Sequence, residues 1–230
     1  MVVVGIIGVL ATLAFPALMR ALESGRSSTC LSNLKQLAMG CLTYSAENEG
    51  VLVPICSGTG AADGKTWRLL ISPYVGTGAV VFRCPSDRIG RTEQFNASRG
   101  LMPSSYGLNY NKAKIGSVVI SQLNEYLGQN PGQRLTAVRE PSATIMLSDI
   151  GYVQNPAASP PMWKEAGSRG GNFGYARFPG DTSDPWMIYP RHAGLKSNVA
   201  YYDGHAASVD FMQEIIAHPN TDGGCIYDNN

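Results

Sequence analysis

An uncharged, apolar run opens the chain and covers residues 2–18, VVVGIIGVLATLAFPAL. As a helix this run would be roughly 26 Å long, slightly shorter than the hydrocarbon core of a bilayer. A cleaved secretory signal fits poorly, because no basic stretch precedes the run. The alternative is a helix buried inside a protein core. Because so long an uncharged run is unusual inside a domain, we expect residues 2–19 to form a transmembrane half-helix.

The same helix is expected to continue past the apolar run with one apolar face. Apolar and small residues recur near helical spacing at Leu31, Leu34, Ala38, Cys41, Leu42 and Ser45, whereas charges lie off that face at Arg20, Glu23, Arg26 and Lys35. Asn48, Glu49 and Gly50 supply a stop, and Pro16 predicts a kink. We therefore predict one helix over residues 1–47, nearly 70 Å long at about 1.5 Å per residue.

The remaining residues, 48–230, lack any long amphipathic helical pattern and are interrupted often by glycine and proline. A short apolar segment at residues 144–149 predicts a strand that ends near Asp149. Residues 199–202 and 206–211 flank Asp203-Gly204, which predicts a hairpin with a two-residue turn. The fold class expected is α+β: a long N-terminal helix packed on the antiparallel sheet of a loop-rich head domain.

The segment from residue 151 to residue 190 holds several aromatic residues among glycines and prolines, including Trp163, Phe173, Tyr175, Phe178, Trp186 and Tyr189. Few strands are expected in this segment, so it is predicted to be a long surface excursion. The aromatic side chains could form a face that binds a sugar or a partner, or they could anchor the excursion to the sheet. The sequence leaves both interpretations open.

Several stretches carry a resemblance to a known family. Residues 5–50, GIIGVLATLAFPALMRALESGRSSTCLSNLKQLAMGCLTYSAENEG, resemble the N-terminal helix of type IV pilin-like proteins, and closely that of the large-headed pseudopilins common in planctomycetes, Verrucomicrobia and Lentisphaerae. CPSD at residues 84–87, SYGLN at 105–109, PSATIMLSD at 141–149, RH at 191–192 and NVAYYDGH at 198–205 follow in that family's order. The motif residues are Cys84, Pro85, Asp87, Tyr106, Asn109, His192, Asp203 and Gly204.

The resemblance implies a structural subunit of a type II secretion or type IV pilus-like filament, and not an enzyme. Such a subunit crosses the inner membrane once, with its head in the periplasm or at the cell surface. Its partners are other pseudopilin subunits, bound through the N-terminal helix, and the inner-membrane assembly platform. The alternative function, from a different class, is a membrane-anchored surface module that binds polysaccharide.

Two departures from the family are visible. The family begins with a basic leader, a cleavage junction for prepilin peptidase and a Glu early in the mature helix, and the sequence beginning at Met1 carries none of them. We therefore expect an in-frame extension upstream that prepilin peptidase would process. The closing motif of the family has nine residues between its His and its Asp-Gly, whereas ten residues separate His192 from Asp203.

Composition narrows the class of partners. Only 15% of the 230 residues are charged and the formal net charge is +1, so no overall attraction to nucleic acid is expected. The chain contains 26 glycines and 14 prolines, which fits a globular but loop-rich protein.

Five cysteines are present, at Cys30, Cys41, Cys56, Cys84 and Cys225, and none forms a Cys-x-x-Cys pair, which argues against a zinc ribbon or a thioredoxin-type centre. Eleven helical residues would place Cys30 and Cys41 about 16 Å apart, too far for a disulfide. If the head lies outside the cytoplasm, disulfides can form, and the pairing we expect is Cys56 with Cys84.

The remaining candidate site consists of Asp149, His192, Asp203 and His205. Carboxylates and imidazoles are ligands for divalent metals, and calcium is the ion suggested by analogy with the heads of secretion pseudopilins. The alternative is structural: Asp203 occupies its turn for backbone reasons, and His192 hydrogen-bonds a carboxylate to hold its loop. Either interpretation places His192 and Asp203 on the same rim of the sheet, with Asp149 nearby. No catalytic residue and no other cofactor is predicted.

Overall fold

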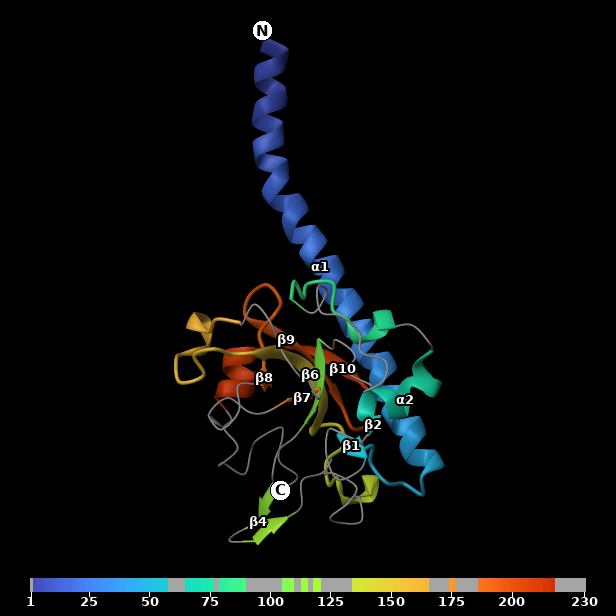
Figure 1. Ribbon diagram of the computed structural model, residues 1–230. Coiled ribbons are helices and arrows are strands. Elements are labelled where there is room, and N and C mark those ends of the chain that lie inside the picture. The colour runs from blue at the N-terminus through green and yellow to red at the C-terminus, as the bar shows by residue number, and fades with distance from the viewer. Residues whose placement is uncertain are drawn as a thin grey trace.

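The computed structural model describes residues 2–57, 65–76, 79–89, 105–109, 113–115, 118–120, 134–165, 174–176 and 186–217. Helix α1 (Val2–Glu47) extends from a head that contains a mixed sheet, so the expected α+β class is confirmed (Figure 1). The other helices are α2 (Trp67–Val75), η1 (Ala79–Phe82), η3 (Leu135–Ala137), η4 (Pro160–Met162) and η5 (Phe211–Ile216). The strands are β1 (Cys56–Ser57), β2 (Lys65–Thr66), β3 (Tyr106–Asn109), β4 (Ala113–Ile115), β5 (Val118–Ile120), β6 (Ile145–Tyr152), β7 (Tyr175–Ala176), β8 (Trp186–Ile188), β9 (Lys196–Tyr201) and β10 (Ala206–Asp210).

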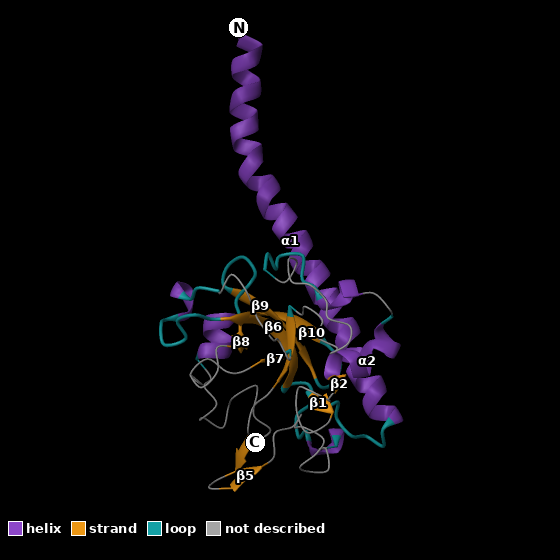
Figure 2. Ribbon diagram, viewed as in Figure 1, coloured by secondary structure: helices purple, strands orange, loops and turns teal. Residues whose placement is uncertain are grey.

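Helix α1 is one continuous element with two different surroundings. Its C-terminal half packs on the head, where the buried face comprises Cys30, Asn33, Leu34, Leu37, Ala38, Cys41 and Ser45. The predicted apolar stripe therefore faces the head, although Leu31 and Leu42 are only partly buried. Figure 2 shows the N-terminal half extending away from the head, and the axis curves between the two parts.

The helix ends where the sequence predicts a stop. Glu49 and Gly50 take left-handed backbone conformations, with φ of 54° and 81°, which a glycine adopts at little cost. The Gly50 N–H donates to the Ser45 carbonyl oxygen at 2.8 Å and so satisfies one of the last helical carbonyls.

The extended part of α1 exposes a series of large apolar side chains. Between 47% and 68% of the surface of each is exposed at Val3, Ile6, Ile7, Leu10, Phe15, Leu18, Met19 and Leu22. Among the residues that the structure describes, no helix combines the length and the apolarity that a membrane crossing needs. The expectation of a transmembrane half over residues 2–19 stays a prediction.

The main sheet has the strand order β10-β9-β6-β3-β7, and β8 also pairs with β6. All pairs are antiparallel except β3 with β7, so the sheet is mixed rather than purely antiparallel as expected. The difference arises because β7 returns after the long segment that follows β6 and enters beside β3 in the same direction. Strand β6 also runs to Tyr152, beyond the predicted end at Asp149.

The predicted hairpin joins β9 to β10. The Tyr201 N–H donates to the His205 carbonyl at 2.9 Å, so the turn contains three residues, Tyr202 to Gly204, rather than the predicted two. Gly204 has φ of 89°, the left-handed conformation that closes a three-residue hairpin turn. A Cβ at this position would also lie 3.1 Å from Leu42 of α1, so the turn approaches the helix closely.

Apolar side chains pack on both faces of the sheet, following the two-residue period of the strands. Ala200 and Tyr202 face the core shared with α1 and α2, whereas Val199 and Tyr201 face a second core on the other side. The second core holds Trp163 and Trp186, only 8% and 5% exposed. These two tryptophans therefore anchor the 151–190 segment to the sheet, while Phe173 and Phe178 lie outside the described residues.

Candidate functional site

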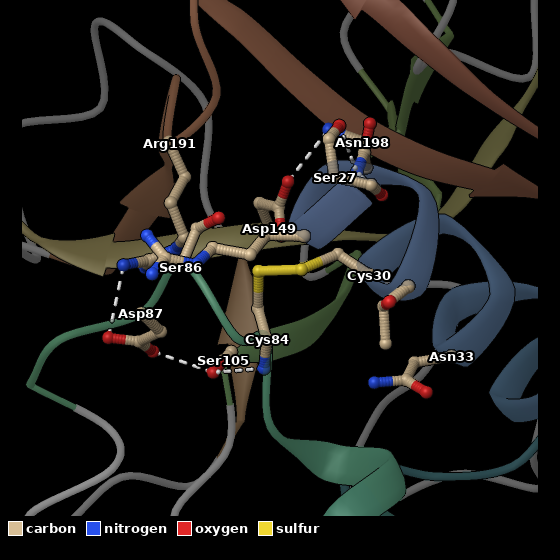
Figure 3. The surroundings of a disulfide bond; sticks show 12 residues. Ser27, Cys30, Asn33, Cys84, Ser86, Asp87, Ser105, Asp149, Arg191 and Asn198 are labelled. Atoms are coloured by element: carbon tan, nitrogen blue, oxygen red, sulfur yellow. Dashed lines mark hydrogen bonds and ion pairs between the residues drawn. A yellow bond between two sulfur atoms is a disulfide. The ribbon is translucent and has the colours of Figure 1, made fainter. Parts of the chain in front are cut away.

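A disulfide between Cys30 and Cys84 fastens α1 to the head, and both cysteines are fully buried (Figure 3). The expected pairing of Cys56 with Cys84 is therefore wrong. Cys30 lies on the same face of α1 as Leu34, and that face brings it to the turn after η1 where Cys84 lies. Cys41 is a buried free thiol, which agrees with the exclusion of a bond between Cys30 and Cys41.

The turn that carries Cys84 also carries a buried acid. The Asp87 side chain is fully buried, and its Oδ2 accepts a hydrogen bond from Ser105 Oγ at 2.6 Å. The same Ser105 oxygen accepts from the Cys84 N–H at 2.9 Å. Asp87 Oδ1 lies 3.1 Å from Arg191 Nη1. Asp87 thus links the disulfide turn, the start of β3 and the segment before β9 (Figure 3).

Arg191 is buried between several acceptors. Its guanidinium contacts Asp87 and Glu165 and donates to the Ile150 carbonyl oxygen, and 4% of its side chain is exposed. Burial alone would lower the pKa of Arg191, but the carboxylates of Asp87, Glu165 and Asp149 outweigh it and raise the pKa further. Arg191 is therefore a permanent buried cation held by two direct ion pairs.

His192 is placed between the sheet and α1. Its Nε2 lies 3.2 Å from Asp149 Oδ2 on β6, and its Nδ1 lies 3.4 Å from Glu23 Oε1 on α1. Burial would lower the pKa of His192, but the hydrogen bonds and charges of Asp149 and Glu23 prevail and raise it. When protonated, His192 connects a carboxylate of the sheet with a carboxylate of the helix.

Further polar contacts connect the same stretch of α1 to the head. Glu23 Oε1 accepts from Ser86 Oγ at 2.6 Å, and the Asn198 side chain donates to the Ser27 carbonyl oxygen at 3.1 Å. The Asn198 N–H in turn donates to Asp149 Oδ2 at 2.7 Å. Glu23, Ser27 and Cys30 are spaced by four and three residues, so they share one face of the helix. We call the disulfide, these contacts of α1, and the adjoining pairs Asp87–Arg191 and Asp149–His192 the clamp.

The four predicted metal-site residues do not come together. Asp149 and His192 are in contact, but Asp203 pairs with His205 at 2.6 Å on the exposed turn between β9 and β10. His192 adjoins the first residue of β9 and Asp203 follows its last, so the length of the strand, roughly 20 Å, separates them. The expectation that His192 and Asp203 share a rim is wrong.

The hydrogen bonds between Asp203 and His205 fit a structural role in their turn. The Asp203 carboxylate accepts from the His205 N–H at 3.0 Å, as expected of an aspartate that holds a turn. Burial would raise the pKa of Asp203, but the hydrogen bonds from the His205 backbone and ring prevail and lower it. Among the described residues, the group with mutually close metal-ligand atoms is Cys30, Cys84 and His192, in which both sulfurs belong to the disulfide.

Most of the predicted motif residues gather around the clamp. Cys84 and Asp87 belong to it, Pro85 lies between them, and the Tyr106 hydroxyl donates to the Cys30 carbonyl oxygen at 3.4 Å. Asn109 lies farther along β3, where its side chain donates to the Ile145 carbonyl oxygen at 2.9 Å. Asp203 and Gly204 occupy the distant hairpin turn.

Sequence reasoning did not predict several members of the clamp, among them Glu23, Cys30 and Arg191. The expectation that Glu23 lies off the packed face is wrong, because Glu23 lies seven residues before Cys30 on the face that contacts the head. Arg191 directly precedes His192. What these residues contact could not be read from the sequence, because each partner is far away along the chain.

Comparison of the sequence with protein-family models, curated proteins and solved structures found no match.

We expect the native disulfide to join Cys30 and Cys84, and its removal to be costly. Its sequence separation of 54 residues implies, through the entropy of the unfolded chain, a stabilisation of about 4 kcal/mol. Peptide mapping under non-reducing conditions should recover the Cys30–Cys84 peptide pair. The C30S/C84S variant should unfold at lower urea concentration, and recovery of a Cys56–Cys84 peptide pair instead would contradict the assignment.

Replacing Asp87 with asparagine should destabilise the protein by about 3 to 5 kcal/mol, because the buried guanidinium of Arg191 loses a direct counter-charge. The matched control is Asp203→Asn, which removes the same charge from an exposed turn and should cost less than about 1 kcal/mol. Urea denaturation of both variants measures the difference. Equal losses of stability in the two variants would show that the buried Asp87–Arg191 ion pair stabilises the protein no more than an exposed charge does.

The raised pKa of His192 predicts that its stabilising contribution depends on pH. A group whose pKa is higher in the folded protein stabilises fully below its unfolded value, about 6.5, and loses this effect as the pH rises through the folded pKa. His192→Gln should therefore lower the free energy of unfolding more at about pH 6 than at about pH 9. Urea titrations of wild type and variant at both pH values test this, and an equal difference at both would refute it.

Proposed function

We propose that this chain is a pseudopilin, a structural subunit of a type II secretion or type IV pilus-like filament held in the inner membrane. The observation that carries the proposal is the row of large apolar side chains that the extended part of α1 exposes, from Val3 to Leu22. A group of exposed large apolar side chains of this kind marks a site of contact with lipid or with other protein.

Lipid and the helices of neighbouring subunits are both suited to contact the apolar surface of this helix. Before assembly, lipid would surround residues 2–19, which contain no charged residue. In a filament, equivalent helices of neighbouring subunits would pack against one another, with Gly5 and Gly8 allowing close approach. The partners proposed are therefore other pseudopilin subunits and the inner-membrane assembly platform, and prepilin peptidase would process an upstream leader.

The clamp supports the same proposal. A subunit that assembles through its helix must present its head in a fixed orientation, and the disulfide with the contacts of Glu23 and Ser27 holds α1 against the head. A buried disulfide is also typical of a head in an oxidising compartment, such as the periplasm or the cell surface. The role proposed is structural and involves neither catalysis nor nucleic acid.

The alternative of a polysaccharide-binding module finds less support. It relies on aromatic side chains of the 151–190 segment, and Trp163 and Trp186 pack in edge-to-face contacts inside the second core, against Phe211 and Tyr152. Rings buried in this way offer no stacking surface to a sugar.

A photo-crosslinking amino acid placed at Ile7 or Phe15 tests the proposal in cells that produce the full chain. We expect membrane-associated adducts that mass spectrometry identifies as a second copy of this chain or another subunit with an apolar N-terminal helix. The control position is Met162, which is 70% exposed on the head and so offers a comparable apolar site away from α1. Adducts no more abundant at α1 than at Met162, or a chain recovered without membranes, would contradict the proposal.

A further inference from the structure

Two polar hollows flank α1 at the point where it enters the head. One, of about 360 Å³, lies between the helix and the turn that contains Pro85, Ser86 and Arg88. The other, of about 260 Å³, lies between the helix and the start of β9. Glu23 and His192 of the clamp line both hollows and so lie between them.

Each hollow is lined by two exposed cationic side chains. These are Arg26 and Arg88 in the first hollow and Arg20 and Lys196 in the second. Among the described residues that line the hollows, Glu23 is the only carboxylate. It is already engaged, because it accepts from Ser86 at 2.6 Å and lies 3.6 Å from Arg26. The rim of the two hollows therefore carries a surplus of positive charge.

Hydroxyl groups complete the lining. Ser24, Ser27 and Ser208 line the second hollow, whereas Ser86 in the first hollow already donates its hydroxyl to Glu23. A pair of cations with nearby hydroxyl donors is the chemistry that recognises a phosphate group through charge-assisted hydrogen bonds. The hollows are open to solvent and their volumes suit a phosphodiester with its adjoining glycerol, rather than a large ligand.

A partly exposed leucine lies next in sequence to Lys196, which lines the second hollow. Leu195 precedes Lys196 in the turn before β9, and it is 37% exposed with a left-handed φ of 55°. A bulky apolar residue adopts this conformation at an energetic cost. An apolar tip next to basic side chains is typical of surfaces that rest in the headgroup region of a bilayer. Figure 1 shows this turn, in orange, and the turn of residues 85–89, in green, at the end of the head from which α1 emerges.

The position along α1 agrees with such a contact. The uncharged run ends at Met19, and Arg20 and Arg26 follow directly. Six helical residues span about 9 Å, slightly more than the roughly 5 to 8 Å of one headgroup layer. If residues 2–19 lie in the hydrocarbon core, the two hollows lie at the level of the lipid phosphates.

We propose that the two hollows bind the phosphodiester groups of anionic phospholipids, so that this end of the head rests on the bilayer surface. The proposal depends on the membrane anchoring proposed above. Lipid contact at both sides of α1 would set the tilt of the head before assembly, since the clamp makes head and helix move together.

Hydrogen–deuterium exchange of the full chain tests this in vesicles of phosphatidylcholine, with or without phosphatidylglycerol. We expect phosphatidylglycerol to slow exchange in residues 85–89 and 191–196, and added salt to reverse the effect. In the R88Q/K196Q variant, the added protection should fall by an order of magnitude or more, because each cation near an anionic surface contributes about 1 kcal/mol.

The control variant K35Q/K164Q removes the same number of positive charges from exposed positions outside the hollows and should keep the protection. If the R88Q/K196Q variant folds poorly, the wild-type protein still tests the inference, because added salt should remove the protection from exchange that phosphatidylglycerol gives. Equal exchange in both kinds of vesicle would overturn the inference while leaving the anchoring intact. Equal protection by inorganic phosphate without vesicles would assign the hollows to free anions and also overturn it. A chain that stays with neither kind of vesicle would refute the anchoring itself.

Discussion

The covalent bond between Cys30 and Cys84 fixes the relation between helix and head on which the other contacts depend. It joins the middle of α1 to the turn that follows η1, 54 residues later. Asp87 lies three residues beyond Cys84 and so is brought to Arg191, while His192, next along the chain, meets Asp149 and Glu23. One bond and two adjacent residues thus connect the helix, β3, β6 and the start of β9.

The polar character of the clamp has a consequence that an apolar contact would not have. An apolar helix face can rotate or slide over an apolar sheet and still bury much of its surface. Ion pairs and hydrogen bonds are directional, and a displaced helix would take Glu23 away from His192 and Ser86, and Ser27 away from Asn198. The apolar residues from Leu34 to Cys41 supply the burial, and the polar contacts from Glu23 to Asn33 penalise other orientations of α1.

The parts of the fold that were predictable from the sequence are those encoded locally. The helix is visible from an apolar run that passes into helical periodicity, its end from Glu49 and Gly50, and the β9–β10 hairpin from Asp203-Gly204. Local sequence patterns do not encode contacts between distant segments. The strand order of the sheet, the parallel pairing of β7 and the Cys30–Cys84 disulfide all depend on such contacts. Placing His192 and Asp203 together failed for a related reason, since they are separated along the chain by a strand whose extended length keeps them apart.

The clamp is placed where the two halves of α1 change surroundings. From Cys30 onward one face of the helix is buried against the head, whereas large apolar side chains between Val3 and Leu22 remain exposed. The exposed part projects by about 30 Å at 1.5 Å per residue, so lateral contacts made by it act on the head through a long arm. A helix held only by its last turns would pivot under such contacts. Contacts at Glu23, Ser27 and Cys30, the nearest described points of attachment to the exposed part, transfer these forces to the central strands β6 and β9 through Asp149 and Asn198. The position of the clamp is therefore the one that best keeps the head aligned with whatever surface covers the apolar half of the helix.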